Sequence, residues 1–362
     1  MQDIRNLNRE QLLHFLTSHQ EPAFRAKQIL EWLWKKNIDS FEGMRNIPVS
    51  LQKKLAEEFN LVKLTIAEEQ KSIDKSLKYK LKLHDGNHIE MVLIPSAKRV
   101  TVCISTQAGC ALKCRFCATG TMGFVRNLSV YEIFEQVFIA NELAKEKFNS
   151  KLSNIVLMGM GEPLLNLDNV CDAVSWITGN EGLGMSPSRI TLSTAGIKDK
   201  INELADRNLG INFALSLHAA NQSKRRLLMP VAENNLLADI SKSLIYFHAQ
   251  TGQRITIEYL LMADVNDSLN DARDLAVFCK NFPVKINIIE YNTCTNTSFR
   301  PASKERLEEF VDFLTTKNIL VQVRNSRGKD IDAACGQLVN SKKSCTFDTI
   351  IFIYFLTTFL HF

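Results

Sequence analysis

The feature that most constrains the fold is a regular alternation of short apolar strands and amphipathic helices that begins near residue 100. The stretches with strand character are VTVCIST, SNIVLMG, SRITLST, GINFALSL, QRITIEYLL, VKINIIEY and ILVQVR. Helical patterns fill the gaps, as in residues 129–147 and 303–317. Strands that alternate with helices in this way build a parallel sheet with crossover helices. Because no linker divides the run, we predict an α/β fold with a partial or closed parallel β/α barrel.

Two other patterns precede this barrel. Residues 1–62 carry apolar positions at helical spacing, as in REQLLHFLTSH, and predict a small N-terminal helical domain with basic edges. Residues 63–98 change to a period of two residues, and the turn around Asp85 and Gly86 predicts a β-hairpin extension. The barrel itself is then expected over residues 99–338.

The two ends of the chain bear on its location. Residues 339–362 finish with an apolar run of 14 residues from Thr349 to Phe362, which is shorter than the roughly 20 residues that a membrane-spanning helix needs. We therefore expect an atypical tail without function and no stable membrane association. The first residues are polar and charged and do not resemble a secretory signal, so we expect a cytoplasmic protein.

Three of the nine cysteines lie together in CALKCRFC, just after the first barrel strand. In a reducing compartment such thiols serve as metal ligands or redox groups more often than as structural disulfides. A structural zinc site normally has four ligands, and no second pair of cysteines or nearby histidine completes one here. Three thiolates with one open coordination position suit a 4Fe-4S cluster. Cys110, Cys114 and Cys117 are therefore predicted to be its ligands.

Polar residues also gather at the ends of the other predicted strands. They are the stretch 159–163 after the second strand, Ser193 and Thr194 in the third, Ser216 and His218 in the fourth, Glu258 in the fifth and Asn292 after the sixth. The carboxyl ends of parallel strands form the active-site face of β/α folds. We therefore expect these side chains to converge on one mouth together with the cysteines.

With these motifs in view, the chain resembles a known family. A C-x3-C-x2-C motif after the first strand of a β/α barrel is typical of the radical S-adenosylmethionine superfamily. The stretches GCALKCRFCATGTMGFVRNL, MGMGEPLLN, LSTAG, SLHAAN, TIEYLLMADVND and RGKDIDAACGQL are similar to those of the RlmN-type adenine carbon-2 methyltransferases. The resemblance runs from the N-terminal helices to about Leu338. It implies a radical SAM barrel with a 4Fe-4S cluster and S-adenosyl-L-methionine as cofactors.

The resemblance also implies partners and residue roles. The expected substrates are 23S ribosomal RNA and transfer RNA, the electron donor is a protein such as flavodoxin or ferredoxin, and the enzyme is expected to be a monomer. A carboxylate suits the ammonium group of S-adenosylmethionine, and hydroxyl and amide groups suit its other polar edges. The implied cofactor-binding residues are Gly161, Glu162, Ser193, Ser216, Leu217, His218 and Asn292.

Carbon 2 of adenine is neither nucleophilic nor acidic, so simple methyl transfer fails there. The resemblance implies that one S-adenosylmethionine methylates Cys335 and that a 5′-deoxyadenosyl radical from a second molecule activates the new methyl group. The methyl carbon then adds to adenine, Cys103 attacks the sulfur of Cys335 to form a transient disulfide bond, and Glu90 removes the proton from carbon 2. Because thiol exchange needs a thiolate, lowered thiol pKa values are expected.

Two alternative functions remain at this point. A close relative of this reaction methylates carbon 8 of the same adenine with similar motifs, and a non-enzymatic iron–sulfur RNA-binding protein is a second candidate. The net charge of +5 suits an anionic partner. The basic residues that are candidates for phosphate contact are Arg126, Lys224, Arg225 and Arg226.

Overall fold

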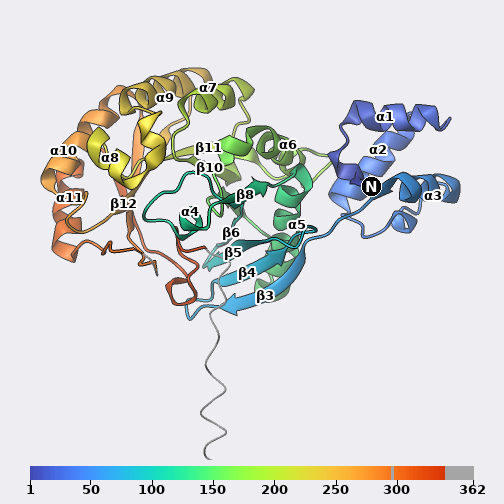
Figure 1. Cartoon of the computed structure of the whole chain (residues 1–362), viewed down its shortest axis with the longest axis horizontal. Helices are drawn as coiled ribbons and strands as arrows, with labels where there is room; N and C mark the ends of the chain where they lie inside the picture. The colour runs from blue at the N-terminus through green and yellow to red at the C-terminus, as the bar shows by residue number, and fades with distance from the viewer. Residues whose placement is uncertain (295–296, 339–362) are drawn as a thin grey trace, which may run out of the picture.

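The computed structural model of the protein describes residues 1–294 and 297–338 (Figure 1). Residues 339–362, where the sequence predicts a tail without function, lie outside the described residues. No helix in the described ranges is long and apolar enough to cross a membrane.

A sheet of ten strands organises the chain, in the order β14-β13-β12-β11-β10-β9-β6-β5-β4-β3. Neighbours from β6 to β14 run parallel. The parallel strands are β6 (Arg99–Cys103), β9 (Asn154–Leu157), β10 (Ile190–Thr194), β11 (Asn212–Ser216), β12 (Ile255–Leu261), β13 (Val284–Glu290) and β14 (Leu320–Arg324). Each one overlaps a stretch predicted from the sequence, so the α/β prediction is confirmed. Within the described residues β14 and β3 end the sheet without pairing to each other, which makes the barrel partial.

Helices cover the outer face of the parallel strands (Figure 1). The longer ones are α5 (Val130–Phe148), α6 (Leu167–Thr178), α7 (Lys198–Arg207), α9 (Leu237–Thr251), α10 (Leu269–Phe278) and α11 (Lys304–Thr316). The capping box between Ser129 and Glu132 starts α5, because each side chain accepts a hydrogen bond from the other residue's backbone amide. Two short helices, α4 (Ala118–Met122) and α8 (Gln222–Leu228), lie near the carboxyl ends of the strands.

The inner face of the sheet is polar. Ser216 pairs with Glu258, Glu258 with Asn287, and Asn287 with Gln322, so one polar row crosses four parallel strands. The alternate positions, such as Ile257 and the residues on either side of Asn287, are apolar and pack in the main core. Parallel barrels usually fill their interior with branched apolar side chains. A polar interior therefore indicates that this barrel holds a site.

The antiparallel strands β3 (Thr65–Lys71), β4 (Leu77–Lys82) and β5 (His88–Ser96) extend the sheet beyond β6. The predicted hairpin is β4–β5, and Gly86 in its turn has a φ of 83°, which favours glycine. The sequence did not predict β3. Most of its residues are exposed and three of the seven are charged, as is common at a sheet edge, so the sequence pattern does not distinguish it as a separate strand within residues 63–98.

The N-terminal helices dock on the barrel through aromatic residues. They are α1 (Arg9–Ser18), α2 (Phe24–Leu30), which continues as a π-helical turn (Glu31–Lys35), and α3 (Val49–Glu58). Trp34, from the π-helical turn, stacks on Trp176 of α6 at 4.6 Å and meets Phe134 of α5 edge-on at 5.0 Å. Such pairs stabilise a contact beyond simple burial of area. The helices therefore pack against the barrel, at the opposite end of the molecule from α11 (Figure 1).

Candidate active site

Two short strands hold the loop that carries the three cysteines. β7 (Gln107–Gly109) pairs with β8 (Phe124–Asn127), and residues 110–123 between them are here called the cysteine loop. Gly109 has a φ of 76°, and a Cβ atom there would stand 2.0 Å from the carbonyl oxygen of Gly123. Only glycine fits so close an approach, so the backbone closes tightly at the base of the loop.

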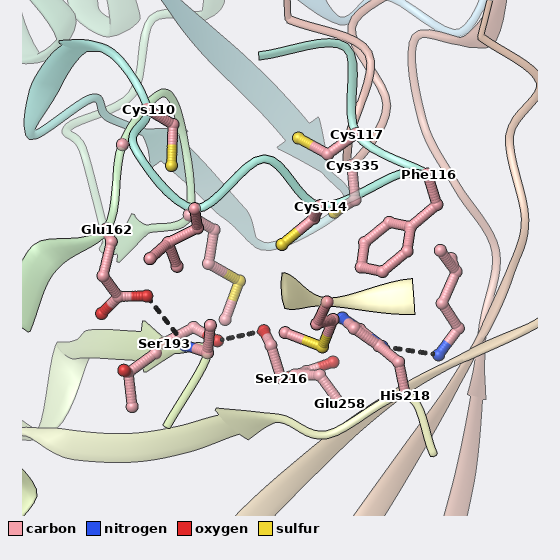
Figure 2. A pocket seen from close by; sticks show the side chains of 18 of the residues that line it. Cys110, Cys114, Phe116, Cys117, Glu162, Ser193, Ser216, His218, Glu258 and Cys335 are labelled. Carbon is pink, nitrogen blue, oxygen red and sulfur yellow. Dashed lines mark hydrogen bonds between the residues drawn. The ribbon is translucent and has the colours of Figure 1, made fainter. Parts of the chain in front are cut away.

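The three cysteines face one cavity. Figure 2 shows them on one side of it, with polar residues from the barrel strands on the other. Burial raises the pKa of Cys110 to about 12 and also raises the pKa values of Cys114 and Cys117. A metal centre removes this penalty, because coordination deprotonates a thiol. The three thiols are therefore a donor set that fits an iron–sulfur cluster.

The spacing of the thiols bears on the kind of centre. Within the described residues, no three His, Cys, Asp or Glu side chains come close enough together to hold a single metal ion. A 4Fe-4S cluster binds its thiolates at separate corners, so Cys110, Cys114 and Cys117 need not meet at one point.

The GMGEP segment is clamped between neighbouring loops. The buried Glu162 accepts hydrogen bonds from the amides of Ala195 at 2.8 Å and Leu164 at 3.0 Å, and its own amide donates to Gln107 at 2.8 Å. A Cβ at Gly161, whose φ is 100°, would lie 2.5 Å from the Gln107 side chain. Burial raises the pKa of Glu162. Because a carboxylate has about four acceptor sites, Glu162 keeps capacity to face a cation in the cavity.

Ser193, Ser216 and His218 stand opposite the cysteines (Figure 2). The two serine hydroxyl groups lie 2.9 Å apart. His218 Nδ1 accepts from the Leu260 amide at 3.1 Å, which leaves the proton of a neutral ring on Nε2. Burial, together with the nearby Arg225, lowers the pKa of His218 to about 3. His218 is therefore a neutral donor at the cavity wall.

Two predicted cofactor residues do not line this cavity in the described structure. The Leu217 side chain is buried in the main core, and its amide and carbonyl are bonded to Glu258 and Arg225. Asn292 donates to Ser326 at 2.9 Å, while its buried Oδ1 atom has no partner among the described residues. Cofactor binding by Leu217 and Asn292 therefore stays a prediction, and neither residue lines the cavity in this arrangement.

A second cavity adjoins the first. Cys103, at the end of β6, and Cys335 both line it, and both thiols are free. Cys117, Met158 and Cys335 belong to the walls of both cavities. Cys335 therefore stands on the border between the space that faces the cysteine loop and the space that contains Cys103.

The pKa values of these two thiols differ from the prediction. Burial raises the pKa of Cys103 to about 12 and also raises that of Cys335, while the Arg324 guanidinium opposes both shifts. The expectation of lowered thiol pKa values is therefore wrong for this structure. Cys335 is an exposed residue, but its thiol is surrounded by enough protein atoms to lose part of its hydration.

Glu90 shares a face of the sheet with Cys103. Val92 of β5 pairs directly with Cys103, and Glu90 lies two residues from Val92 on the same face. Glu90 is buried, stands 3.7 Å from the ammonium group of Lys78 and lines neither cavity in the described structure. Lys78 also donates to the Asp332 carbonyl at 3.3 Å, which connects Glu90 to the segment that carries Cys335.

The segment before Cys335 is fastened to the β3–β4 turn. Asp330 accepts hydrogen bonds from the Ser72 hydroxyl at 2.6 Å and the Ile73 amide at 3.0 Å. Asp74 accepts from the Gly328 amide at 2.9 Å. Burial alone would raise the pKa of Asp74, but hydrogen bonds from Gly328, Ser76 and Ser72 lower it to about 2. We call this arrangement the Asp74–Asp330 clasp, and it fastens the segment that leads to Cys335.

Most of the chain is similar to known RNA methyltransferases. Residues 2–61 match the Ribosomal RNA large subunit methyltransferase N-terminal domain, and residues 104–276 match the Radical SAM superfamily. A "Probable dual-specificity RNA methyltransferase RlmN" of Cytophaga hutchinsonii is 49% identical over 335 residues, which cover 92% of each chain. The chain belongs to the RlmN family. A "Dual-specificity RNA methyltransferase RlmN" of Campylobacter hominis is 41% identical over 88% of this chain and 92% of its own.

A solved structure matches nearly the whole chain. The radical SAM methyltransferase from Sphaerobacter thermophilus superposes with a TM-score of 0.87 at 36% sequence identity, and the match covers 93% of this chain and 99% of that chain. The resemblance inferred from the sequence motifs is therefore confirmed. Membership of the RlmN family, with its radical SAM domain, makes a 4Fe-4S cluster and S-adenosyl-L-methionine the cofactors of this protein.

Most of the basic residues proposed for phosphate contact form ion pairs with carboxylates of the same chain. Lys224 forms an ion pair with Asp271 at 2.7 Å, and Arg226 pairs with Glu233 at 3.3 Å. Arg225 is fully buried, so its prediction as a phosphate contact is wrong. Arg126 is bonded to both Asp85 and Glu132 and ties the hairpin to α5.

Proposed function

We propose that this RlmN-family protein methylates carbon 2 of adenine in 23S ribosomal RNA and in transfer RNA, with Cys335 as the methyl carrier. The observation that carries the proposal is the position of Cys335. It borders the cavity of the cysteine loop on one side and the cavity of Cys103 on the other. A methyl carrier needs access both to the methyl donor and to a residue that releases the product.

The cofactor site is proposed from the walls of the first cavity. Cys110, Cys114 and Cys117 would hold the cluster, which when bound supplies the electron that cleaves S-adenosylmethionine into methionine and a 5′-deoxyadenosyl radical. Among the chain's own groups, the Glu162 carboxylate suits the ammonium group of the methionine portion. The other wall groups proposed to orient the cofactor are the backbone at Gly161, the hydroxyls of Ser193 and Ser216 and the ring of His218. Leu217 and Asn292 do not line the cavity, so their proposed contact with the cofactor requires a local rearrangement.

The catalytic residues are proposed from the second cavity. The sulfur of Cys335 accepts a methyl group from one S-adenosylmethionine. After one hydrogen atom of that methyl group has passed to the 5′-deoxyadenosyl radical of a second molecule, the same carbon bonds to carbon 2 of adenine. Cys103 attacks the sulfur of Cys335, so a disulfide forms as the bond between that sulfur and the transferred carbon breaks. Glu90 accepts the proton from carbon 2. This role requires Glu90 to leave Lys78 and turn toward the cavity, which its place on the Cys103 face of the sheet allows.

Analysis of the methylated nucleoside tests the function. The reconstituted protein is incubated with reductant, S-adenosylmethionine and either 23S ribosomal RNA or transfer RNA, and digested nucleosides are examined by mass spectrometry. We expect 2-methyladenosine from both RNAs. A carbon-8 product would instead support the related carbon-8 reaction, and the absence of any methylated adenosine would support a non-enzymatic RNA-binding protein. The same assay with flavodoxin or ferredoxin as reductant tests the predicted electron donor, and sedimentation tests the predicted monomer.

Charge reversal on the N-terminal helices should weaken RNA binding. Lys27, Lys35 and Lys53 are exposed there, and we propose that they contact phosphates. Changing all three to Glu should lower RNA affinity at least tenfold in low salt and flatten its salt dependence, because phosphate contacts release counterions. Filter binding at several salt concentrations measures both effects. Cleavage of S-adenosylmethionine without RNA should not change.

The control for this variant is Lys304→Glu. Lys304 is an exposed lysine of α11, at the far end of the molecule from the N-terminal helices. It should bind RNA normally. Equal RNA affinity of the triple variant and the wild-type protein would contradict a role of these helices in RNA binding.

Loosening the Asp74–Asp330 clasp should slow methylation of Cys335. In the double variant Asp74→Asn/Asp330→Asn the segment loses hydrogen bonds to charged acceptors, each of which contributes about 1.5 kcal/mol. Since about 1.4 kcal/mol corresponds to tenfold in rate, the loss of even one such contribution should slow formation of methyl-Cys335 at least tenfold, measured by intact-protein mass spectrometry. Asp264→Asn, on an exposed loop outside the clasp, is the control. An unchanged rate would show that the clasp does not position Cys335.

A further inference from the structure

Arg225 is a fully buried arginine that the proposed chemistry does not use. Its Nε atom donates to the Leu217 carbonyl at 3.3 Å, and Nη2 donates to the Ala195 carbonyl. Its Nη1 atom has no hydrogen-bond partner among residues 1–294 and 297–338. No carboxylate in these ranges lies within 4.0 Å of the guanidinium group. An isolated buried charge is costly unless a group of opposite sign compensates it.

The surroundings of Arg225 identify where such a group can stand. Arg225 lies on α8, and the Leu228 carbonyl at the end of α8 accepts a hydrogen bond from the Arg115 amide in the cysteine loop at 3.0 Å. Leu228 and Phe116 share a small apolar cluster against which Cys114 packs. The cysteine loop therefore rests directly on the helix that carries the buried cation.

Electrostatic contacts connect the same two elements. Cys114 is the acidic group whose charge acts on Arg225, and Arg225 in turn favours the thiolate of Cys114. Burial lowers the pKa of Arg225 to about 10, so the guanidinium still carries its charge at neutral pH. A buried positive charge thus lies on the helix against which the cysteine loop packs, in apolar surroundings where charges interact strongly.

We propose that Arg225 is the internal counter-ion of the 4Fe-4S cluster and raises its reduction potential. The inference rests on the proposed ligation of the cluster by Cys110, Cys114 and Cys117. Reduction adds one electron, and hence one negative charge, to a cluster already bound by thiolates. A nearby guanidinium stabilises the reduced form more than the oxidised form, and charge near a cluster is among the factors that set its potential. Arg225 is a positioning and electrostatic residue here, and it does not touch the reacting carbon.

Two variants distinguish an electrostatic role of Arg225 from a purely structural one. Arg225→Gln keeps a hydrogen-bond donor near the Leu217 and Ala195 carbonyls but removes the charge. Arg225→Lys keeps the charge and loses the planar fork of donors. If the charge acts on the cluster, the Gln variant has a lower reduction potential while the Lys variant stays close to wild type. If Arg225 only ties two loops together, the potentials do not follow the charge.

A potentiometric titration followed by electron paramagnetic resonance measures this directly. The reconstituted full chain is titrated without S-adenosylmethionine, and iron and sulfide are quantified in each sample. We expect the reduction equilibrium constant of Arg225→Gln to fall at least tenfold, which is about 59 mV for a one-electron couple. The matched control is Arg226→Gln, the same substitution one position further on α8, where the arginine pairs with Glu233 at the surface. Equal potentials for Arg225→Gln and wild type, at equal cluster content, overturn the proposal.

A second measurement covers the case in which the Gln variant loads the cluster poorly. The melting temperature of wild type and of Arg225→Met is measured with and without the cluster. If Arg225 is a counter-ion, the cluster raises the melting temperature less in the Met variant than in wild type. If Arg225 is only a structural tie, the substitution lowers the melting temperature equally with and without the cluster, which overturns the proposal. If the wild-type protein binds no cluster at all, the proposed function fails as well. If it binds a cluster whose potential ignores Arg225, only this inference fails.

Discussion

Cys103→Ala will become covalently trapped on its RNA substrate, whereas Cys335→Ala will form neither methylated protein nor adduct. The two thiols line one cavity, but only Cys335 also borders the cavity of the cysteine loop. Without the sulfur of Cys335 the methyl group has no carrier. Without Cys103 the carrier can still be loaded and can still bond to adenine, but no thiol attacks the sulfur to release the product.

The trapped species can be identified directly. After reaction with RNA, ribonuclease digestion and peptide mass analysis should find a nucleotide on the peptide that contains Cys335 in the Cys103→Ala variant. Trapping should consume nearly all active enzyme, and turnover should fall at least a thousandfold, to a single event per enzyme, as expected when an essential covalent step is lost. Cys279→Ala removes another buried cysteine, which lines neither of these two cavities, and should turn over normally. Normal turnover of Cys103→Ala would show that Cys103 is a buried strand cysteine without a catalytic role.

Release of the product should be faster at higher pH. The thiol pKa of Cys103 is raised to about 12, so the neutral thiol dominates at neutral pH and the thiolate fraction grows about tenfold for each pH unit below that value. The rate at which adduct disappears in a single-turnover reaction should therefore rise between pH 7 and pH 9. A rate that is flat across this range would show that a neighbouring base, rather than bulk hydroxide, deprotonates Cys103.

The architecture of the site was predictable because its signals are local. Apolar runs predicted each of the parallel strands, and most of the polar residues at their carboxyl ends, such as Glu162 and Ser193, line one cavity together with the cysteines. Asn292 is the exception, since it does not line that cavity. Close spacing in the sequence was enough for Cys110, Cys114 and Cys117, since ligands on one loop need no long-range information. The convergence of distant motifs followed from the general rule for parallel strands.

Other features depend on tertiary contacts that a sequence pattern does not contain. Successive residues on a helix point about 100° apart. Lys224 therefore pairs with Asp271, Arg225 points into the interior, and Arg226 lies at the surface. A run of three basic residues looks like a solvated face, and only the packing of α8 under the cysteine loop shows that the middle one is buried. The raised pKa of Cys103 has the same origin, because it comes from burial by neighbouring strands.

The cluster ligands provide the second prediction with a large expected effect. Cys110→Ala, Cys114→Ala or Cys117→Ala should each abolish the brown chromophore and all cleavage of S-adenosylmethionine, because the remaining two thiolates do not complete the proposed ligand set. Iron and sulfide analysis after anaerobic reconstitution measures the loss, and circular dichroism checks that the barrel is still folded. The barrel should remain intact, since the loop is held at its base by Gly109 and Gly123 rather than by the thiols.

Cys294 offers a control for this experiment from the same neighbourhood. Its sulfur lies 3.7 Å from the Phe116 carbonyl of the cysteine loop and 3.4 Å from the Gly336 carbonyl, yet it is not a wall residue of the cavity that the three loop cysteines face. Cys294→Ala should therefore keep a full complement of iron and sulfide. If the triple variant of Cys110, Cys114 and Cys117 retained stoichiometric iron and sulfide, ligation by the loop would be wrong. If Cys294→Ala lost the cluster as completely as the loop variants, the ligand set would have to include a thiol outside the C-x3-C-x2-C motif.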